Sequence, residues 1–312
     1  MVYSKVSVVI ITKNEGKAIE RCLKSVFNQS VKPLEVIVVD GRSTDDTRTR
    51  ARKFPVRILV ETGQTSPSNA RNLGVANAKG EIVLIMGADT ELDIDCVRNA
   101  IKYFQDPNVL VVIPSLKIRI HTRLEMIQVK WFYGTRSRLR TVHGTGSSIQ
   151  FIRKGVYLRV NFDPSFGFGD DSDFRRRLQK LYSGPQRIVK ASDSSIFVDL
   201  PHSLSEVSSQ YIWYGRTSLK YFARYHSLGA MLRLGSLLMP SLFLISCIAT
   251  LILPSAIYVL IPLLVLLLAR NIIACFRSRS GYFFEFAFFD LARSLLFLWG
   301  VTQGFFVRKT GR

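Results

Sequence analysis

Three carboxylates occupy four consecutive positions in Asp170-Asp171-Ser172-Asp173. Close like charges raise the pKa of at least one member of such a group, so the cluster could supply a proton acceptor for catalysis. The cluster also precedes residues 174–181, which read as a basic helix, and Asp at a helix start caps free N–H groups and complements the helix dipole. From these residues alone, a catalytic role and a capping role are equally good interpretations.

The N-terminal half predicts the elements that would position such a site. Apolar, β-branched runs occupy residues 6–11, 34–39, 56–60, 81–86 and 109–113. Helical patterns alternate with them at residues 18–27, 44–53, 68–78 and 95–104. This alternation predicts an α/β fold with a doubly wound, mostly parallel sheet, whose ligand lies at the carboxyl ends of the strands.

Polar residues follow three of these strands and would meet at one edge of the sheet. They are Thr12, Asn14, Glu15, Asp40, Ser43 and Asp89. Each alone is ordinary turn chemistry, because Asp, Asn and Ser form local hydrogen bonds in turns. Their recurrence at separate strand ends favours a binding site. The chain has no Gly-x-Gly-x-x-Gly after the first strand and no Gly-Lys-Ser/Thr loop, which argues against a dinucleotide oxidoreductase and a P-loop hydrolase.

Four short motifs in this region appear in the order found in the GT-A-fold, inverting glycosyltransferases of family 2, which residues 5–226 resemble. The motifs are Ile11-Thr12-Lys13-Asn14-Glu15, Val38-Val39-Asp40-Gly41-Arg42-Ser43, Ala70-Arg71-Asn72-Leu73-Gly74 and Met86-Gly87-Ala88-Asp89-Thr90. The resemblance implies a GT-A fold and a nucleotide-sugar donor linked to UDP or GDP. The donor contacts that it implies come from Thr12, Asn14, Glu15, Asp40, Ser43, Arg71, Asn72 and Ala88.

The last of these motifs lies where the family carries a metal-binding Asp-x-Asp, but its first Asp is Gly87 here. The resemblance therefore leaves Asp89 as the carboxylate that would hold Mg²⁺ or Mn²⁺ between the two phosphates of the donor. The segment Val198-Asp199-Leu200-Pro201-His202 resembles a later strand, whose His reaches the metal or the diphosphate in some members. On that basis His202 is a second candidate metal ligand.

The carboxylate cluster also has a counterpart in the family, which carries Glu-Asp at a helix start after a Gly-rich strand and a Phe-Asp pair. The matching segments here are His143-Gly144-Thr145-Gly146-Ser147-Ser148, Phe162-Asp163 and Asp170-Asp171. By this match Asp171 is the general base that deprotonates an acceptor hydroxyl, and Asp170 tunes or orients it. Processive members carry Gln-x-x-Arg-Trp, which Gln210-Tyr211-Ile212-Trp213-Tyr214 lacks, so one sugar is expected to be added per encounter.

The C-terminal part predicts a membrane domain at residues 227–312, after a GT-A domain at residues 1–226. Residues 234–269 contain no charged side chain, and as one helix they would be roughly 54 Å long against a hydrocarbon core of about 30 Å. We therefore expect a hairpin of helices at residues 234–253 and 255–276. Basic residues flank both outer ends, which predicts a multi-pass protein of the cell membrane with its catalytic domain on the cytoplasmic face.

Two further segments leave their relation to the membrane open. Residues 282–307 are apolar but include Glu285, Asp290 and Arg293, so they are expected to form an interfacial helix, with a third span as the alternative. Residues 124–139 fit an amphipathic helix lying on the membrane and a core-packed helix equally well.

The formal net charge of +20 indicates an anionic partner, and a membrane with a lipid-linked acceptor accounts for it without a nucleic-acid motif. We expect transfer of one sugar to a hydroxyl of a lipid-linked or glycolipid acceptor. The alternative is a polyprenyl-phosphate sugar synthase, whose phosphate acceptor needs no general base. A non-catalytic membrane scaffold, suggested by Gly87, is a hypothesis from another class. The oligomeric state stays open.

Overall fold

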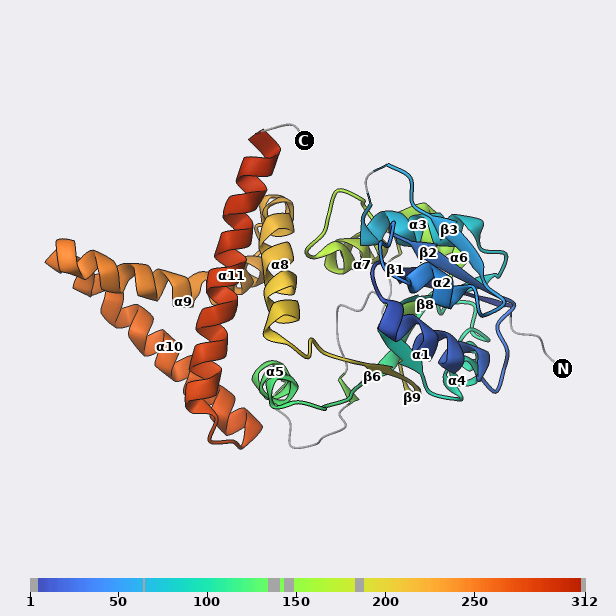
Figure 1. Ribbon diagram of the computed structural model, residues 1–312, viewed down its shortest axis with the longest axis horizontal. Helices are drawn as coiled ribbons and strands as arrows, with labels where there is room; N and C mark the ends of the chain where they lie inside the picture. Colours follow the sequence, from blue (N-terminus) through green and yellow to red (C-terminus); the bar gives the residue numbers. More distant parts are fainter. Residues whose placement is uncertain (1–4, 64, 134–140, 143–148, 183–187, 310–312) are drawn as a thin grey trace. The chain divides into compact units, whose positions relative to one another are not determined.

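The computed structural model describes residues 5–63, 65–133, 141–142, 149–182 and 188–309 (Figure 1). The chain divides into two compact units. The first contains Met1–Arg119 and Leu139–Asp199, and the second contains Ile120–Arg138 and Leu200–Arg312. The second unit takes in residues on both sides of residue 226, and the domain boundary there stays a prediction. Each unit is described below by itself.

The first unit is built on a mixed β-sheet. Its strands are β1 (Val6–Thr12), β2 (Glu35–Asp40), β3 (Arg57–Val60), β4 (Ile82–Gly87), β5 (Thr90–Leu92), β6 (Val111–Ile118), β7 (Thr141–Val142), β8 (Gln150–Arg153) and β9 (Ile188–Val198). Their order in the sheet is β3-β2-β1-β4-β8-β6-β9-β5, and β7 pairs with β6. The pairings of β1 with β2 and β4, of β2 with β3 and of β6 with β9 are parallel.

The expected mostly parallel α/β sheet is confirmed in these pairings, but β5, β7 and β8 pair antiparallel and were not predicted. These three strands have two to four residues each, which is too short for an alternating pattern to stand out. The expected Gly-rich strand at residues 143–148 lies outside the described residues.

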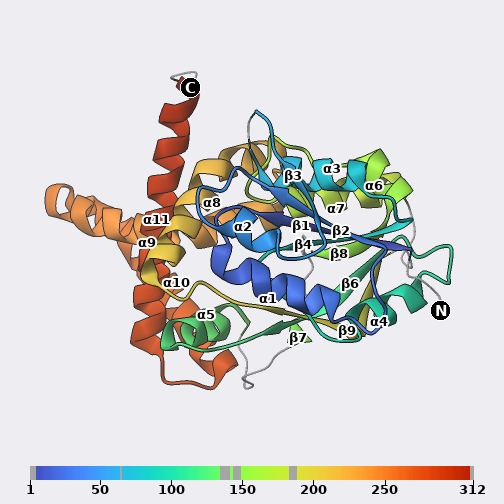
Figure 2. The same cartoon turned by 45° about the vertical axis from the view of Figure 1, so that its right-hand side comes forward.

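Helices cover both faces of the sheet in the first unit. They are α1 (Gly16–Phe27), α2 (Thr47–Ala51), α3 (Pro67–Asn77), α4 (Cys96–Tyr103), α6 (Lys154–Val160) and α7 (Asp170–Leu181). Figure 2 shows α1 on one side of the sheet and α3 and α6 on the other. Val8 and Ile10 of β1 pack into one core while Val9 packs into the other, so the apolar run reads as continuous because both faces are buried.

Helix α2 is shorter than the sequence indicated. The pattern predicted a helix over residues 44–53, capped by Ser43 or Thr44, whereas α2 begins at Thr47 after Asp46. The Ser43 hydroxyl and the Thr44 N–H bind Asn14 instead, so this part of the segment forms a turn.

The second unit is helical and contains α5 (Arg123–Tyr133), α8 (Leu204–Arg224), α9 (Leu228–Ile252), a short 3₁₀ turn (Pro254–Ala256), α10 (Ile257–Ser278) and α11 (Phe283–Lys309). Helices α8 and α11 approach closely through glycines. A Cβ on Gly215 of α8 would collide with the Phe297 carbonyl oxygen, and a Cβ on Gly300 of α11 would collide with the Ile212 carbonyl oxygen. This contact explains why α8 groups with the C-terminal helices and not with the sheet.

Two charged residues of α11, Asp290 and Arg293, are paired inside the second unit. Asp290 is buried and forms ion pairs with Arg293, at 2.5 Å, and with Arg270 of α10. Both guanidinium groups lie over the ring of Trp131 on α5, which is itself mostly buried. Of the two interpretations of residues 124–139, the described part of α5 therefore fits the core-packed one.

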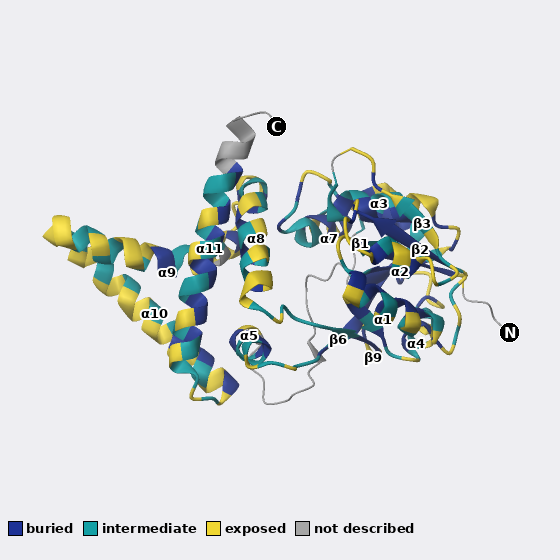
Figure 3. Ribbon diagram, in the orientation of Figure 1, coloured by how far each residue is buried: buried dark blue, intermediate teal, exposed yellow. Residues whose placement is uncertain are grey.

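Helices α9 and α10 occupy the expected hairpin. By length and composition, they are the two described helices that could cross a membrane. Most of their apolar side chains are exposed, including Leu251 and Ile252 at 85% and Phe276 at 80%, as the prevailing yellow of these helices in Figure 3 shows. Exposed apolar area of this extent is unfavourable in water and marks a surface that lipid or another protein covers.

Candidate donor and acceptor site

The carboxyl ends of three parallel strands meet at one edge of the first unit's sheet. Thr12 of β1 stands opposite Asp40 of β2, and Ile11 stands opposite Gly87 of β4. The Gly41 N–H donates to the Thr12 carbonyl oxygen at 2.8 Å, and the Ala88 N–H donates to the Ile11 carbonyl oxygen at 3.1 Å. The expected convergence of strand-end residues is therefore present in the structure.

The turns that follow β1 and β2 are hydrogen-bonded to each other. The Asn14 N–H donates to the Ser43 Oγ at 2.8 Å, and the Thr44 N–H donates to the Asn14 Oδ1 at 2.8 Å. The Glu15 N–H donates to the Thr47 Oγ1 at 2.8 Å, and Glu15 is the N-cap residue of α1. Asn14 adopts φ +57°, a conformation that Asn tolerates. These contacts give Asn14 and Ser43 a structural task at the edge of the site.

Two buried polar atoms at this edge lack a hydrogen-bond partner within the described residues. They are the Thr12 Oγ1 and the Asp40 Oδ1. The other carboxylate oxygen of Asp40 accepts from the Ser43 N–H at 3.0 Å, and the Arg48 Nε lies 3.7 Å from it. An unsatisfied buried acceptor costs about 1–3 kcal/mol, so an unsatisfied pair at a strand edge points to a ligand that supplies the missing partners.

Glu61 belongs to the same edge and was not predicted. It follows β3 directly, its N–H donates to the Asp40 carbonyl oxygen at 3.0 Å, and its Oε1 accepts from the Ser66 N–H at 3.2 Å. Burial raises the pKa of the Glu61 carboxyl, while Ser66, Lys13 and Arg42 oppose that rise. The strand-end rule applied to residues 56–60 would have identified it.

Asp89 lies just beyond β4, in the turn to β5. Its side chain is exposed, yet the surrounding protein raises the pKa of its carboxyl, and the negative charge of Asp199 adds to the rise. A Cβ on Gly87 would collide with the Asp89 Oδ1, so the glycine leaves the space that this carboxylate occupies. The Ala88 side chain packs in the hydrophobic core, and its N–H donates to the Ile11 carbonyl oxygen.

The oxygen ligands available around Asp89 suit a hard divalent cation. In the described part of the chain, no three His, Cys, Asp or Glu side chains gather as a metal cluster. Asp89 and the nearby Asp199 offer carboxylate oxygens, and Mg²⁺ is usually held by one or two carboxylates with substrate phosphates and water. The residues therefore fit a cation that a bound diphosphate shares.

Asp170 and Asp171 begin α7 but have different surroundings. The Asp170 Oδ2 accepts from the Arg71 guanidinium at 2.5 Å and from the Ser68 Oγ at 3.1 Å, both on α3. Burial raises the pKa of the Asp170 carboxyl, and Arg71 opposes that rise. The Asp171 Oδ1 accepts from the Ser172 N–H at 2.7 Å, and no ion pair reaches Asp171 within the described residues. Asp170 thus ties α7 to α3, while Asp171 keeps an oxygen available.

The remaining motif residues around α3 and α7 hold the two helices together. The Asn72 Oδ1 accepts from the Tyr157 hydroxyl and the Phe162 N–H, and its Nδ2 donates to the Phe162 carbonyl oxygen. The Arg71 guanidinium lies 4.7 Å from the centre of the Phe162 ring. Asn72 was expected to face the donor, but these contacts occupy its amide and give it a structural role.

Asp173 is buried and paired with Arg177 at 2.7 Å along α7. The third carboxylate of the cluster therefore holds a basic neighbour on its own helix.

His202 lies in the second unit, in the segment before α8. It does not belong to a strand, since β9 ends at Val198. Its Nδ1 contacts the Glu125 carboxylate, which is buried and also accepts from the Thr122 N–H at 2.7 Å. Its N–H donates to the Glu206 Oε2 at 2.8 Å. Asp89 and His202 thus belong to different units, and His202 contacts Glu125, Glu206 and the ring of His121.

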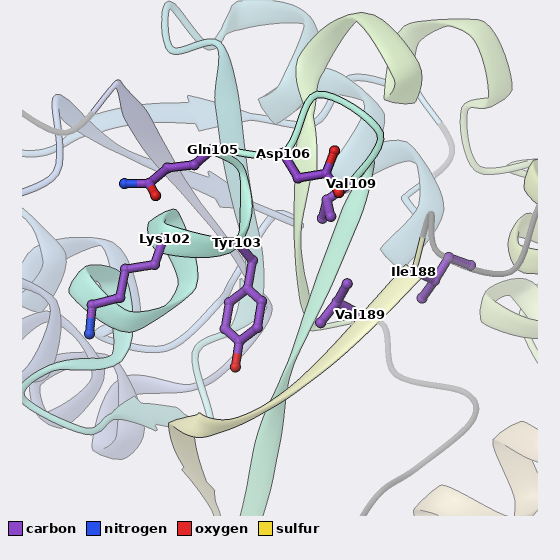
Figure 4. Close-up of a pocket in the computed structure, with 7 residues that line it drawn as sticks. All are labelled: Lys102, Tyr103, Gln105, Asp106, Val109, Ile188 and Val189. Carbon is purple, nitrogen blue, oxygen red and sulfur yellow. The ribbon is translucent and has the colours of Figure 1, made fainter.

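A pocket of about 670 Å³ lies at the amino ends of β6 and β9, the opposite edge of the sheet (Figure 4). Its lining residues are Lys102, Tyr103, Gln105, Asp106, Val109, Ile188 and Val189. None of these belongs to the strand-end set, so the pocket is separate from the candidate site.

The fold resembles that of solved nucleotide-sugar transferases. A mannosyltransferase from Pyrobaculum calidifontis, in complex with GDP-Man and Mn²⁺, superposes with a TM-score of 0.56 at 18% identity, covering 97% of this chain and 88% of that one. TarS from S. aureus gives a TM-score of 0.50 at 19% identity over 67% of this chain and 39% of that one. At these identities the likeness concerns the fold alone, which is of GT-A type.

The family is identified by sequence. The model of Glycosyl transferase family 2 matches residues 7–160, and this part of the chain belongs to that family. The resemblance seen in the motifs is thereby confirmed.

Two curated relatives carry names that describe lipid-linked acceptors. A dolichyl N-acetyl-α-D-glucosaminyl phosphate 3-β-D-2,3-diacetamido-2,3-dideoxy-β-D-glucuronosyltransferase of Methanococcus voltae is 26% identical over 58% of this chain and 64% of its own length. A GalNAc(5)-diNAcBac-PP-undecaprenol β-1,3-glucosyltransferase of Campylobacter jejuni is 36% identical over 28% of this chain and 30% of its own length. The matched part is less than two thirds of either relative.

Proposed function

We propose that this chain is a membrane-bound glycosyltransferase that moves one sugar from a nucleotide-sugar to a lipid-linked acceptor, with inversion at the anomeric carbon. The observation that carries the proposal is the unsatisfied pair of buried oxygens, Thr12 Oγ1 and Asp40 Oδ1, at the strand edge. A nucleobase and ribose offer N–H and O–H donors that would satisfy Asp40, and they offer acceptors for the Thr12 hydroxyl. The family assignment supports a nucleotide-sugar as the source of these groups.

Asp171 is the general base in this proposal. One of its oxygens, Oδ1, is held by the Ser172 N–H and hydroxyl, and the other is left for the acceptor within the described contacts. The acceptor hydroxyl gives its proton to Asp171 as its oxygen attacks the anomeric carbon. The bond from that carbon to the diphosphate breaks, and the nucleoside diphosphate leaves with the electron pair. Asp170 orients its neighbour, because Arg71 and Ser68 fix it in place.

A divalent cation, Mg²⁺ or Mn²⁺, would stabilise the charge that develops on the leaving diphosphate. Asp89 is the residue of this chain that would hold it, and the oxygen donors available there suit such a cation. His202 stays a second candidate by the family resemblance, and Nε2 is the ring nitrogen that Glu125 does not engage.

The acceptor is proposed to be lipid-linked on two grounds. The exposed apolar surfaces of α9 and α10 suit a bilayer, and both helices are long enough to cross one. The named acceptors of the Methanococcus and Campylobacter relatives are dolichyl- and undecaprenol-linked sugars. The excess of basic residues suits a cytoplasmic membrane face and the phosphates of such carriers.

The test is Asp171→Asn in the full chain, purified in detergent and supplied with a panel of nucleotide-sugars and lipid-linked acceptors. We expect transfer to fall at least a hundredfold, while binding of the nucleoside diphosphate, measured by calorimetry, stays within twofold. Asp106→Asn, which removes a carboxylate from the opposite edge of the sheet, is the matched control and should keep full activity.

The outcomes separate the competing functions. Near-normal transfer by Asp171→Asn would point to a phosphate acceptor, which is already ionised at neutral pH and needs no base. No transfer by the wild-type chain, together with no nucleotide binding, would favour a membrane scaffold instead.

A further inference from the structure

Two carboxylates lie next to each other at the end of the short ladder between β5 and β9. The ladder is antiparallel with Thr90 opposite Val198, so the next pair outward is Asp89 and Asp199. Opposite residues in such a pair have Cβ atoms about 4.5–5.5 Å apart, and like charges at these positions are destabilising. A cation bound between the two carboxylates would relieve this repulsion.

The described basic side chains near this pair bind the neighbouring carboxylates. Arg21 binds the Asp199 Oδ2 at 2.8 Å and lies 3.6 Å from the Glu91 carboxylate. Arg119 binds both oxygens of Glu91, at 2.6 and 3.1 Å. Within the described residues no ion pair reaches Asp89.

Gly87 leaves this turn without the first carboxylate of the family's pattern. The Asp89 side chain folds back over Gly87, and a Cβ there would require the Asp89 carboxylate to shift. Asp199 directly follows β9, the strand that pairs with β5, and presents a carboxylate from that neighbouring strand.

We propose that Asp89 and Asp199 together hold the divalent cation of the donor diphosphate, with Asp199 replacing the carboxylate that Gly87 lacks. This inference rests on the proposed function and names a residue for its metal. Two carboxylates from one side leave the other positions of an octahedral cation for phosphate oxygens and water. The cation would also offset the repulsion between the two carboxylates.

The test is binding of Mn²⁺ to the full chain in detergent, read from the loss of the free-ion electron paramagnetic resonance signal, with and without UDP or GDP. Asp199→Asn should weaken Mn²⁺ binding at least tenfold, as should Asp89→Asn, with unchanged circular dichroism. Asp193→Asn is the matched control, because it removes an exposed carboxylate from the same strand. It should change Mn²⁺ affinity less than twofold.

Arg21→Gln separates metal binding from a purely structural role of Asp199. If Asp199 serves only to pair with Arg21, this variant should lose Mn²⁺ binding as Asp199→Asn does. If Asp199 holds the cation, Arg21→Gln should keep or tighten Mn²⁺ binding, because a competing positive charge is gone.

Wild-type Mn²⁺ affinity in Asp199→Asn would overturn the inference, and so would an equal loss in Arg21→Gln or no Mn²⁺ binding by the wild-type chain. The proposed function has a separate readout, which is sugar transfer by the wild-type chain. A wild-type chain that transfers sugar while Asp199→Asn still binds Mn²⁺ normally would contradict the metal assignment alone.

Discussion

At the scale of single residues, the candidate site is defined by what its side chains leave unsatisfied. Thr12 ends β1, and Asn14 lies two residues beyond it. Asn14 forms hydrogen bonds with Ser43 and Thr44 of the neighbouring turn, whereas the Thr12 hydroxyl is buried without a partner in the described structure. A buried hydroxyl without a hydrogen-bond partner lowers the stability of the free protein. Its position at a strand edge is best explained by a ligand that forms the missing hydrogen bond.

Thr12→Val is predicted to act with opposite signs on stability and binding. The methyl group replaces an unsatisfied hydroxyl of similar size, so the free energy of unfolding without ligand should stay the same or rise by up to about 1 kcal/mol. Nucleoside diphosphate affinity should fall by about tenfold, which corresponds to about 1.4 kcal/mol. Chemical denaturation and calorimetry measure the two quantities.

Thr47→Val is the matched control for that prediction. The Thr47 Oγ1 accepts from the Glu15 N–H, so the same substitution there leaves a backbone donor without its partner. We expect a loss of stability of about 1–3 kcal/mol. If Thr12→Val destabilises the protein as much as Thr47→Val, Thr12 is a structural residue.

The two adjacent aspartates of α7 should also differ in their effect on local stability. The side chains of Asp170 and Arg71 are only 12% and 8% exposed, and breaking a buried ion pair costs about 3–5 kcal/mol. Asp170→Asn should therefore speed hydrogen exchange in α3 and in the first turns of α7. Asp171→Asn, which breaks no ion pair, should leave that exchange unchanged. Equal protection in both variants would contradict the assigned division of roles.

At the scale of elements, periodicity predicted most of the sheet and little of its pairing. Residues 6–11 were recognisable because both faces of β1 are buried, and α3 and α7 followed from their turn residues and spacing. Strand Thr90–Leu92 was not predicted, because three residues are too few to show an alternating pattern. Its pairing with β9, which brings Asp89 and Asp199 together at the end of the ladder, was therefore not predicted either. Donor residues could be predicted at strand ends, whereas the structural use of Asn72 depends on Tyr157 and Phe162, which are distant in sequence.

Helices α8 and α11 depend on glycine for their close approach, and this yields a further prediction. A Cβ at Gly300 would collide with the Ile212 carbonyl oxygen, which belongs to backbone and cannot rotate away. Gly300→Ala should therefore lower stability by about 1–3 kcal/mol, the usual cost of overpacking, despite the better helix propensity of Ala. The measurement is thermal unfolding of the full chain in detergent.

Gly235→Ala in α9 is the matched control, because nothing lies within 4 Å of a Cβ added there. This variant should gain up to about 1 kcal/mol from helix propensity. A gain of the same size in Gly300→Ala would mean that α8 and α11 do not pack as closely as described.

At the scale of the whole molecule, a basic, nucleotide-binding type of fold and a strongly apolar hairpin are joined in one chain of 312 residues. The exposed apolar surface of the hairpin has two explanations, which extraction from membranes can distinguish. If lipid covers α9 and α10, the chain should stay with membranes after washing with high salt and alkaline carbonate, and only detergent should release it. If another protein covers them, carbonate should release the chain.

Charge placed in the middle of α10 tests the same point by substitution. Val265 and Leu266 of α10 are 58% and 54% exposed, and a lysine near the centre of a membrane-spanning helix costs about 2.5–3.5 kcal/mol. The double variant Val265→Lys, Leu266→Lys should therefore lose most of its carbonate-resistant fraction. Leu204→Lys, at an exposed position of α8 outside both candidate spans, should behave as wild type. Equal membrane retention of the double variant and of Leu204→Lys would mean that α10 does not lie in lipid, and the lipid-linked acceptor would then lose its structural support.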